Sequence, residues 1–359
     1  MLTATQTLDL VNKALAELPF ERKPEGLYAP VKYVLALGGK RIRPVLMLMA
    51  YELYRDDVKA IMPAALGIEM YHNYTLLHDD VMDKADMRRG KPTVHKVWNE
   101  NTAILSGDSM LVLAYRLMAQ VSDHCLRSVM DLFTETALEI GEGQQYDMEF
   151  ESRMDVSEEE YIEMIRLKTS VLLACALKLG ATQAGAPEAD AGHLYRFGEN
   201  LGLAFQLQDD LLDVYGDPKT FGKNIGGDIL EGKKTFMLIN ALRLATPEQR
   251  EALTAWLNTP VASAATPSQN VHASPAISAS SSSASNIQLG FGSVLDGSSA
   301  EKIAAVTALY NQIGVRQLAE QRINSYFEAA FKELDAVELP AERKQPLRDF
   351  ALSLLGRQS

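Results

Sequence analysis

Apolar residues recur three and four positions apart along most of the chain, which is the spacing of one face of an α-helix. Three stretches show this best, at Leu8, Val11, Leu15 and Leu18, at Ile162, Ile165, Leu172 and Leu179, and at Ile323, Phe327, Phe331 and Leu334. Ser157 followed by Glu160 predicts a capping box at the start of the second stretch. Glycine and proline fall mostly between these stripes, and no convincing run of alternating strands occurs. The pattern predicts an all-α protein.

One segment departs from this pattern. Residues 261–300 are rich in serine and alanine, carry almost no charge and include the run SASSSSAS. They have no helical period, which is typical of a flexible linker or a disordered loop. Helical sequence resumes after them, but the remaining chain is too short to form a good core alone. We therefore expect residues 1–359 to form a single helical domain that a disordered insertion interrupts, rather than two domains.

Composition narrows the class of protein. The 359 residues are 47% hydrophobic, and 35 lysines and arginines against 47 acids give a net charge of −12. Because a nucleic-acid-binding protein needs a basic face, this balance argues against one. The two cysteines, Cys125 and Cys175, lie far apart in apolar helical stretches and are interpreted as reduced core thiols. Without a signal-peptide pattern or an apolar run of ~20 residues, we expect a cytoplasmic protein with no stable membrane insertion.

The acid cluster Asp-Asp-x-x-Asp occurs twice in apolar surroundings. The clusters comprise Asp79, Asp80 and Asp83 in LLHDDVMD, and Asp209, Asp210 and Asp213 in FQLQDDLLD. On a helix, the first and last acids of each cluster share one face, where like charges repel. Burial beside leucine makes this repulsion much more unfavourable unless a cation binds. All-oxygen ligands with room for water suit Mg²⁺, which prefers one or two carboxylates plus substrate phosphates.

Two other interpretations compete with a magnesium site. One such cluster is often a solvated acidic helix face, although two copies in apolar settings weaken this interpretation. A ferritin-like di-iron bundle needs two Glu-x-x-His motifs and two further glutamates. The chain has Glu69-x-x-His72, but its only partner is Asp190-x-x-His193, which has the wrong acid.

Basic residues lie near the acid clusters in the sequence. They are Lys40, Arg41 and Arg43 in GGKRIRP, Arg88 and Arg89 in MRRGKP, Lys168 beside Thr169 in RLKTS, and Lys223, Lys233 and Lys234 in FGKNIGGDILEGKKT. Each group alone is weak evidence, because a lysine pair is usually part of a solvated face. Together with two clusters of the magnesium type, they predict sites for diphosphates that are held by metal and by Arg or Lys.

The motifs GGKRIRP, LLHDDVMDKADMRRGKPTVH and FQLQDDLLDVYGD, in this order, resemble those of the trans-isoprenyl diphosphate synthases, the polyprenyl synthetase family. The likeness covers nearly the whole chain except roughly residues 261–300. It implies the isoprenoid synthase type of fold, a bundle of antiparallel helices around a deep central cavity, and usually a homodimer. The implied enzyme is a Mg²⁺-dependent transferase that condenses isopentenyl diphosphate with dimethylallyl, geranyl or farnesyl diphosphate. Its products are farnesyl or geranylgeranyl diphosphate and free diphosphate.

The resemblance also implies roles for individual residues. The two acid clusters face each other across the cavity and share about three Mg²⁺ ions around one diphosphate. The implied metal-site residues are Asp79, Asp80, Asp83, Asp209, Asp210 and Asp213. Those for isopentenyl diphosphate are Lys40, Arg43, His72 and Arg89. Those for the allylic diphosphate are Arg88, Lys168 and Lys223, with Lys233 as a further substrate-binding residue. The polar residues beside the developing carbocation are Thr169 and Gln206.

Product length is expected to depend on the residues just before the first acid cluster. Thr75 and Tyr74 precede Asp79 by four and five positions, which places them ~6–8 Å deeper along a helix. In the family that the chain resembles, bulky groups here form a floor that stops elongation. One aromatic and one small residue therefore predict a short product, of farnesyl to geranylgeranyl length.

Two further functions remain as alternatives to a prenyl diphosphate synthase. A terpene cyclase would share the fold and the first acid cluster, but is expected to lack the second Asp-Asp-x-x-Asp cluster and the Lys40 and Arg43 site. A noncatalytic subunit of a heteromeric synthase would usually have lost one cluster, whereas both are intact here.

Overall fold

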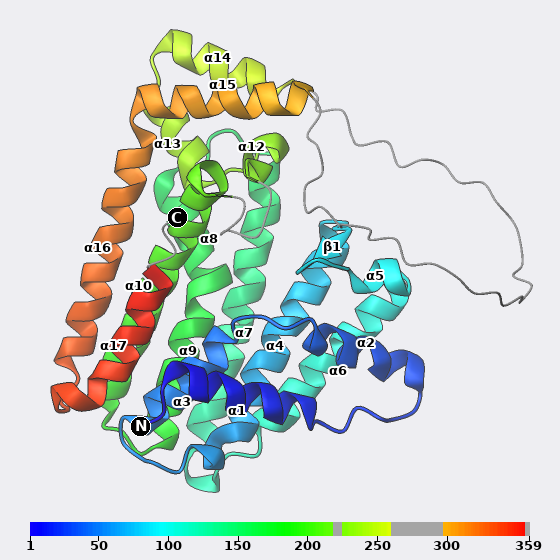
Figure 1. The fold of residues 1–359 in the computed structure, drawn as a ribbon, viewed down its shortest axis with the longest axis vertical. Helices are drawn as coiled ribbons and strands as arrows, with labels where there is room; N and C mark the ends of the chain where they lie inside the picture. Colours follow the sequence, from blue (N-terminus) through cyan, green and yellow to red (C-terminus); the bar gives the residue numbers. More distant parts are fainter. Residues whose placement is uncertain (218–224, 260–296, 356–359) are drawn as a thin grey trace, which may run out of the picture. The chain divides into compact units, whose positions relative to one another are not determined.

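The computed structural model describes residues 1–217, 225–259 and 297–355 (Figure 1). The chain divides into two compact units. The first contains Met1–Asp209 and Ala319–Gln358, and the second contains Asp210–Leu318. Most of the predicted insertion at 261–300 lies outside the described residues. Residues 297–300 are the exception, because helix α15 (Gly297–Ile313) already begins there. The single-domain organisation stays a prediction.

Helices make up most of the described structure, which has almost no strands, and the all-α prediction is confirmed. Those wholly within the first unit are α1 (Ala4–Ala16), α2 (Glu25–Ala36), α3 (Ile42–Glu52), η1 (Val58–Ile61), α4 (Met62–Met82), α5 (Val94–Val97), α6 (Glu100–Met118), α7 (Asp123–Glu151), α8 (Glu158–Ile165), η2 (Arg166–Ser170), α9 (Val171–Gln183) and α17 (Ala341–Leu355). Those within the second are α12 (Gly227–Glu231), α13 (Phe236–Leu244), α14 (Pro247–Leu257) and α15. The two that run from one unit into the other are α10 (Glu188–Tyr215) and α16 (Val315–Ala336).

Side-chain caps fix several helix starts. The predicted capping box is confirmed: the Glu160 backbone N–H donates to Ser157 Oγ at 3.1 Å, and the Ser157 N–H donates to the Glu160 carboxylate at 2.9 Å. Thr3 and Gln6 form the same box at the start of α1. Such boxes satisfy backbone donors that the first helical turn leaves without partners.

The segment that follows this capping box is less regular than its periodicity predicts. The π-helical turn η2 separates α8 from α9. Gly143 of α7 packs directly against this turn, because a Cβ at position 143 would lie 2.4 Å from the backbone nitrogen of Lys168. A π-turn inserts one extra residue into a helix and is frequent at functional sites. The periodicity of apolar residues alone did not reveal this insertion.

A short hairpin is the second departure from the predicted pattern. Strands β1 (Met87–Arg88) and β2 (Lys91–Pro92) pair in antiparallel register. The two residues of the turn, Arg89 and Gly90, have φ of 52° and 73°. Positive φ at both positions suits the turn that best joins two twisted strands. Strands of two residues are too short to produce a visible alternation in the sequence.

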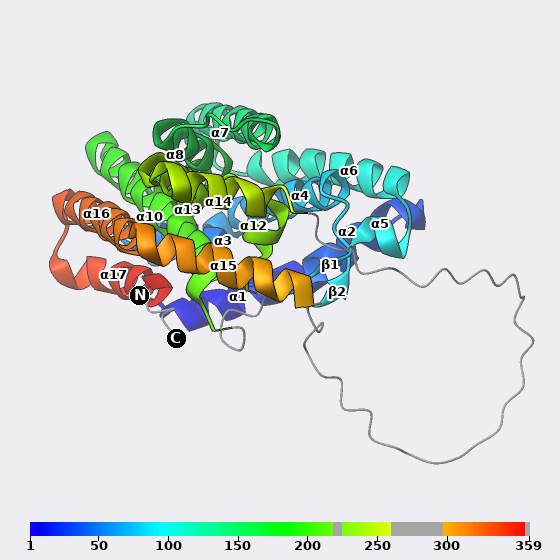
Figure 2. The same cartoon turned by 90° about the horizontal axis from the view of Figure 1, so that it is seen from above.

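The first unit is built around a continuous core. Helix α4 packs along α6, α3 packs along α9, and α7 lies against η2 and α9 (Figures 1 and 2). Cys125 and Cys175 are free and buried in this core, and burial raises the pKa of the Cys175 thiol to about 12. The interpretation of both cysteines as core thiols is therefore confirmed. In the second unit, α12, α13 and α14 pack against α15.

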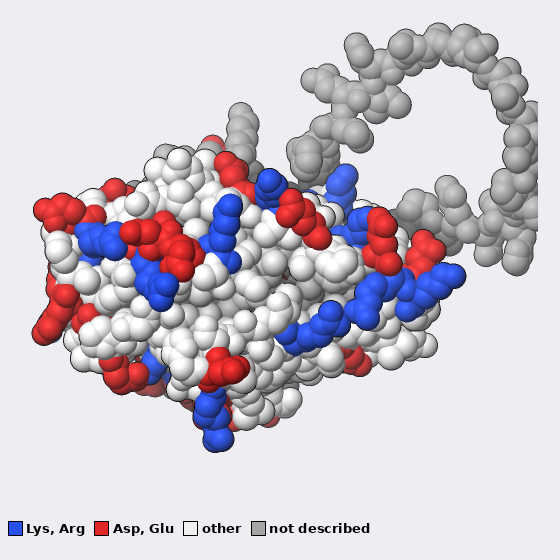
Figure 3. Space-filling view, turned by 90° about the horizontal axis from the view of Figure 1, so that it is seen from below, with Lys and Arg blue, Asp and Glu red and all other residues white. Residues whose placement is uncertain are grey.

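The distribution of surface charge and the hydropathy of the helices both bear on the class of protein. On the face drawn in Figure 3, groups of acidic and basic side chains are both present, and several basic side chains follow one another in a row at the right. Among the helices of the described ranges, none is long and apolar enough to cross a membrane.

Candidate active site

The C-terminal turn of α4 presents the first acid cluster. Asp79 is half-buried, Asp80 is buried, and Asp83 is exposed at the C-cap. Burial raises the pKa of Asp79; the Lys168 ammonium opposes this rise, while the carboxylates of Asp83 and Asp147 add to it. The charged form of Asp79 is thus held in an unfavourable environment. A cation beside it would relieve that strain.

Asp80 has a different environment. Nε of Arg88, on β1, donates to both carboxylate oxygens of Asp80, at 2.8 and 2.9 Å. Burial raises the pKa of Asp80, and Arg88 counteracts the rise. This pair holds the hairpin against the end of α4. The structure thus gives Asp80 a cationic partner within the protein, and its contribution to a metal site stays a prediction.

Lys168 lies on the π-turn and points to an acid that the sequence analysis missed. Its Nζ donates to Oδ2 of Asp147, on α7, at 2.6 Å. Asp147 follows Gly143 by one helical turn, so the glycine that admits the π-turn and the acid that receives Lys168 share one region of α7. The surrounding stretch GEGQQYDMEFE is rich in acids, and its sequence gave no reason to single out Asp147.

Thr169 and Gln206, which the resemblance places beside the carbocation, contact each other. Oγ1 of Thr169 donates to Oε1 of Gln206 at 3.3 Å, which joins η2 to α10. Both side chains are half-buried. Their oxygen atoms form a fixed polar patch in an otherwise apolar setting, which is suited to a transient positive charge.

The residues predicted for isopentenyl diphosphate also gather in the first unit. Nη1 of Arg43 lies 3.1 Å from Nε2 of His72. Burial lowers the pKa of His72 well below its usual range, and Arg43, Arg89, Arg88 and Arg41 lower it further. The ring is therefore neutral at pH 7, with Nε2 accepting from Arg43 and Nδ1 carrying the proton.

Arg43 keeps its positive charge despite its burial. Burial lowers the pKa of Arg43 to about 10, which still leaves the side chain protonated at pH 7. Arg89 donates to the backbone oxygen of Gly38, just before the exposed Lys40. Arg43, His72, Arg89 and Lys40 thus lie around one loop, between α2 and α3.

The second acid cluster lies on α10, with Asp209 in the first unit and the other two acids in the second. Oδ2 of Asp210 accepts from the backbone N–H of Phe236 at 3.3 Å, at the start of α13. Oδ2 of Asp213 accepts from the N–H of Asp228 at 3.1 Å, at the start of α12. Helix N-termini favour carboxylates. These acids therefore support local structure, and their metal roles and the facing of the two clusters stay predictions.

The sequence analysis also predicted two lysines for this part of the site. Lys233 is exposed between α12 and α13, and its backbone N–H donates to the carbonyl oxygen of Asp228 at 2.9 Å. Lys223 lies outside the described residues.

The donor set of the first cluster fits Mg²⁺. Among the residues that the structure describes, no three His, Cys, Asp or Glu side chains already converge into a group that could hold a metal ion. Mg²⁺ does not need such a cage, because it keeps several waters and uses one or two carboxylates plus substrate phosphates. Asp79 and Asp83 supply those carboxylates, and the raised pKa of Asp79 shows a charge that a cation would stabilise.

The di-iron interpretation is wrong for the residues that suggested it. Oε1 of Glu69 lies 2.7 Å from Nη1 of Arg41, and His72 is paired with Arg43. Asp190 accepts from the Tyr54 hydroxyl at 2.8 Å. These side chains pair with other side chains of the same chain and so hold helices together.

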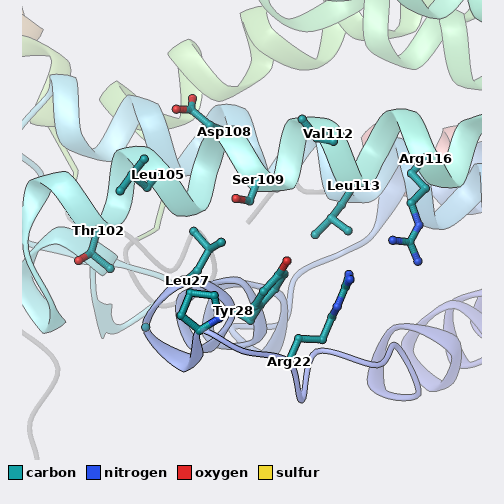
Figure 4. A pocket seen from close by; sticks show the side chains of 12 residues that line it. Arg22, Leu27, Tyr28, Thr102, Leu105, Asp108, Ser109, Val112, Leu113 and Arg116 are labelled. Carbon is teal, nitrogen blue, oxygen red and sulfur yellow. The ribbon is translucent and has the colours of Figure 1, made fainter.

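A separate cavity of about 720 Å³ opens between α6 and the start of α2 (Figure 4). Its walls are largely apolar, with Leu27, Leu105, Val112 and Leu113 among the lining residues. None of the predicted metal or substrate residues lines it. The cavity therefore does not belong to the candidate active site.

Comparisons with known proteins agree with the fold. A family model described as polyprenyl synthetase matches residues 24–271. A geranylgeranyl diphosphate synthase of Methanosarcina mazei is 42% identical over 233 residues, which are 64% of this chain and 72% of that protein. A short chain isoprenyl diphosphate synthase of Methanocaldococcus jannaschii is 43% identical over 232 residues, 64% of this chain and 71% of that protein. A crystal structure of a geranylgeranyl pyrophosphate synthase is 41% identical, with a TM-score of 0.85 and 100% of both chains covered.

The helical bundle and the acid cluster on α4 define an all-α isoprenoid synthase fold. The chain belongs to the polyprenyl synthetase family, so the predicted family and the predicted class of enzyme, a prenyl-transferring synthase, are confirmed. The family as a whole depends on Mg²⁺, in agreement with the fit of Asp79 and Asp83.

Proposed function

We propose that this chain joins isopentenyl diphosphate to an allylic diphosphate and produces geranylgeranyl diphosphate and free diphosphate. The observation that carries the proposal is the environment of Asp79, in which burial makes the charged carboxylate unfavourable. Lys168 and Arg88 lie close enough to Asp79 to lower its pKa. A metal-bound diphosphate would meet carboxylates and cationic side chains at this place. Two of the similar synthases are named for geranylgeranyl diphosphate, which supports this product, and a third is named a short chain isoprenyl diphosphate synthase.

The first step is loss of diphosphate from the allylic substrate, with its C–O bond breaking and the electron pair leaving on oxygen. About three Mg²⁺ ions, when bound, supply Lewis-acid stabilisation of that leaving group. Lys168 can turn from Asp147 to the diphosphate, and Arg88 adds a second cationic donor. Charge-assisted hydrogen bonds of this kind are the strong ones.

The second step is attack of the isopentenyl double bond on the allylic cation. Lys40, Arg43 and Arg89 bind the isopentenyl diphosphate, and neutral His72 donates from Nδ1. Thr169 and Gln206 direct oxygen dipoles towards the cation. The condensed cation then loses a proton to the departed diphosphate, which restores a double bond and completes the balance. In this account the enzyme acts by preorganised electrostatics.

We also propose a homodimer formed through α6 and α7. Large apolar side chains are exposed on both helices: Ile104, Leu105, Val112, Leu138, Tyr146 and Met148. Tyr115 and Phe133 join the two helices, with ring centroids 5.0 Å apart. Exposed apolar patches on soluble proteins mark interaction sites. A second copy is the occupant that fits, since the relatives' family commonly forms dimers. A cytoplasmic location stays a prediction.

Val112→Glu is expected to convert the dimer into a folded monomer. Val112 is 67% exposed, so a glutamate does not disturb the core of one chain but introduces a charge into the proposed interface. Light scattering after size-exclusion chromatography measures the mass. Leu352→Glu on α17, at a side chain that is 45% exposed, should leave the dimer intact. A dimeric Val112→Glu variant would show that this face is not the interface.

Product length is the finer part of the proposal. Tyr74 lies one turn before His78 with ring centroids 4.8 Å apart, and its ring is 5.5 Å from that of Tyr71. Tyr71 in turn packs on Phe133 of α7. Thr75 donates its hydroxyl to the His72 carbonyl oxygen, so it adds little bulk or polarity beside Asp79. We infer that Tyr74 begins an aromatic floor that limits the growing tail.

Tyr74→Ala is expected to shift the product distribution towards chains longer than geranylgeranyl, because it removes the first ring of this floor. Chromatography of dephosphorylated products, with each allylic primer in turn, measures the shift. Tyr74→Phe keeps the ring and should keep the product. An active, folded Tyr74→Ala variant with the wild-type distribution would move length control elsewhere, such as the Ser109–Met110 part of α6.

A further inference from the structure

A buried ion pair lies next to the residues proposed for isopentenyl diphosphate. Glu69, on α4 one turn before His72, is 1% exposed, and Arg41 is 5% exposed. Oε1 of Glu69 lies 2.7 Å from Nη1 of Arg41. Two charges withdrawn from water in this way need good geometry and further hydrogen bonds to be tolerated. The pair is therefore a built feature of the loop between α2 and α3.

Both residues make further hydrogen bonds, while Oε2 of Glu69 and Nε of Arg41 are buried without one. Nδ2 of the fully buried Asn73 donates to Oε1 and to the backbone oxygen of Glu69, each at 2.8 Å. Nη2 of Arg41 donates to the carbonyl oxygen of Leu35 at 2.5 Å, in the last turn of α2. Asn73 thus fixes the carboxylate, and the carboxylate fixes the guanidinium. Arg41 in turn ties the end of α2 to α4.

The backbone at Arg41 shows what this tie achieves. Arg41 has a φ of 46°, in the left-handed region, immediately before α3 begins. A long side chain rarely adopts this conformation, which persists only where surrounding contacts determine it. The loop has positive φ at Gly38 and Gly39 as well. The ion pair with Glu69 therefore holds an otherwise unfavourable loop in one conformation.

This loop carries or contacts the diphosphate-binding set. Lys40 directly precedes Arg41, and Arg43 follows it by two residues to reach His72. From the hairpin, Arg89 donates to the backbone oxygen of Gly38. The Arg89 side chain also packs against Gly39, because a Cβ at position 39 would lie 2.8 Å from Cζ of Arg89. A change in the loop would displace Lys40 and Arg43 and release Arg89.

We propose that Glu69 is a positioning residue for isopentenyl diphosphate: through Arg41 it fixes the loop between α2 and α3 and the first turn of α3, so that the cationic side chains converge on the diphosphate. The inference rests on the proposed function and adds a residue that does not itself touch the substrate. The Glu69 charge also raises the pKa of Arg43, which burial lowers, and so helps to keep that guanidinium protonated.

Charge alone predicts the opposite effect, which makes the proposal testable. Glu69 is an anion near a site for an anion, so its neutralisation should tighten binding of isopentenyl diphosphate if only long-range attraction mattered. If Glu69 acts by positioning, neutralisation should weaken that binding. The sign of the change in affinity distinguishes the two roles.

The experiment is steady-state kinetics of Glu69→Gln with Mg²⁺, isopentenyl diphosphate and farnesyl diphosphate. We expect the KM for isopentenyl diphosphate to rise about tenfold or more, while kcat and the KM for farnesyl diphosphate change within about twofold. Glu158→Gln is the matched control, because Glu158 is a buried partner of Arg322 in the same unit. It should lower the melting temperature without changing the KM for isopentenyl diphosphate.

A second variant keeps the test decisive if Glu69→Gln folds poorly. Arg41→Gln should raise the same KM, and Arg41→Gln with Glu69→Gln should be no worse than the stronger single change, because the two residues act as a unit. An unchanged or lower KM in the folded single or double variants would overturn the proposal. Wild-type protein that neither binds nor condenses isopentenyl diphosphate would instead refute the proposed function.

Discussion

Asp79→Asn is expected to melt at a higher temperature than the wild type in the metal-free state and yet to lose turnover by about 10²–10³-fold. Burial raises the pKa of Asp79, so its carboxylate at pH 7 is less favourable in the folded protein than in the unfolded one. Asparagine has nearly the same shape and removes that charge. Each kcal/mol regained corresponds to less than the about 2–4 °C typical of chains of 150–250 residues, because the shift falls as chains lengthen.

The pH dependence of this difference follows from the sign of the shift. A raised pKa means that the folded state binds the proton more tightly than the unfolded state does. The penalty from charged Asp79 is therefore fully present above the folded-state pKa and disappears as the pH falls through it. The two melting temperatures should differ most at neutral pH and converge in acid.

Calorimetry in EDTA and kinetics in saturating Mg²⁺ measure the two effects. Asp86→Asn is the control, because Asp86 is exposed and pairs with Lys96 at 2.8 Å, which lowers its pKa. It should gain no stability and keep its turnover. An Asp79→Asn variant with near wild-type kcat would show that Asp79 holds no catalytic metal.

Gly143→Ala is expected to lower kcat about a hundredfold. The added Cβ would lie 2.4 Å from the backbone nitrogen of Lys168 and 2.8 Å from its Cα. Backbone atoms cannot turn aside as a flexible side chain can, so η2 must move. Lys168 and Thr169 move with it, and a displacement of about 1 Å at a catalytic group can reduce the rate by about 10²-fold.

Gly141→Ala provides a matched control on the same helix. A Cβ at position 141 meets nothing within 4 Å, and alanine favours a helix interior over glycine by up to about 1 kcal/mol. This variant should keep its kcat and gain stability. The steady-state rate with farnesyl diphosphate measures kcat for both glycine variants. Equal kcat values for the two variants would show that catalysis does not depend on the position of the π-turn η2.

The sequence predicted the site best where chemistry depends on residue type and order. Acids at helical spacing in apolar surroundings indicated a cation site at Asp79. The resemblance assigned Arg43 and His72 to one substrate site, and Thr169 and Gln206 to the surroundings of the carbocation. The structure places the two members of each pair in contact. These residues are separated by about 30 or more positions, so the family motifs carried information that periodicity alone does not contain.

The sequence failed where function depends on how closely two backbones approach. The periodicity of α8 and α9 continues across η2, so it gave no sign of a π-turn. Asp147 is one of many acids on α7, and only its contact with Lys168 distinguishes it. Glu69 suggested a metal motif by its spacing to His72, whereas tertiary packing gives it Arg41. Long-range pairings of this kind are absent from a single sequence.

The measurement that tests the account most directly follows isopentenyl diphosphate and released diphosphate together. Purified protein is incubated with Mg²⁺, labelled isopentenyl diphosphate and farnesyl diphosphate, and then with EDTA in place of Mg²⁺. The account predicts geranylgeranyl diphosphate and one released diphosphate for each isopentenyl unit incorporated, only when Mg²⁺ is present. Release of diphosphate with a cyclised hydrocarbon and no incorporation of label, or no turnover by the purified chain alone, would contradict it.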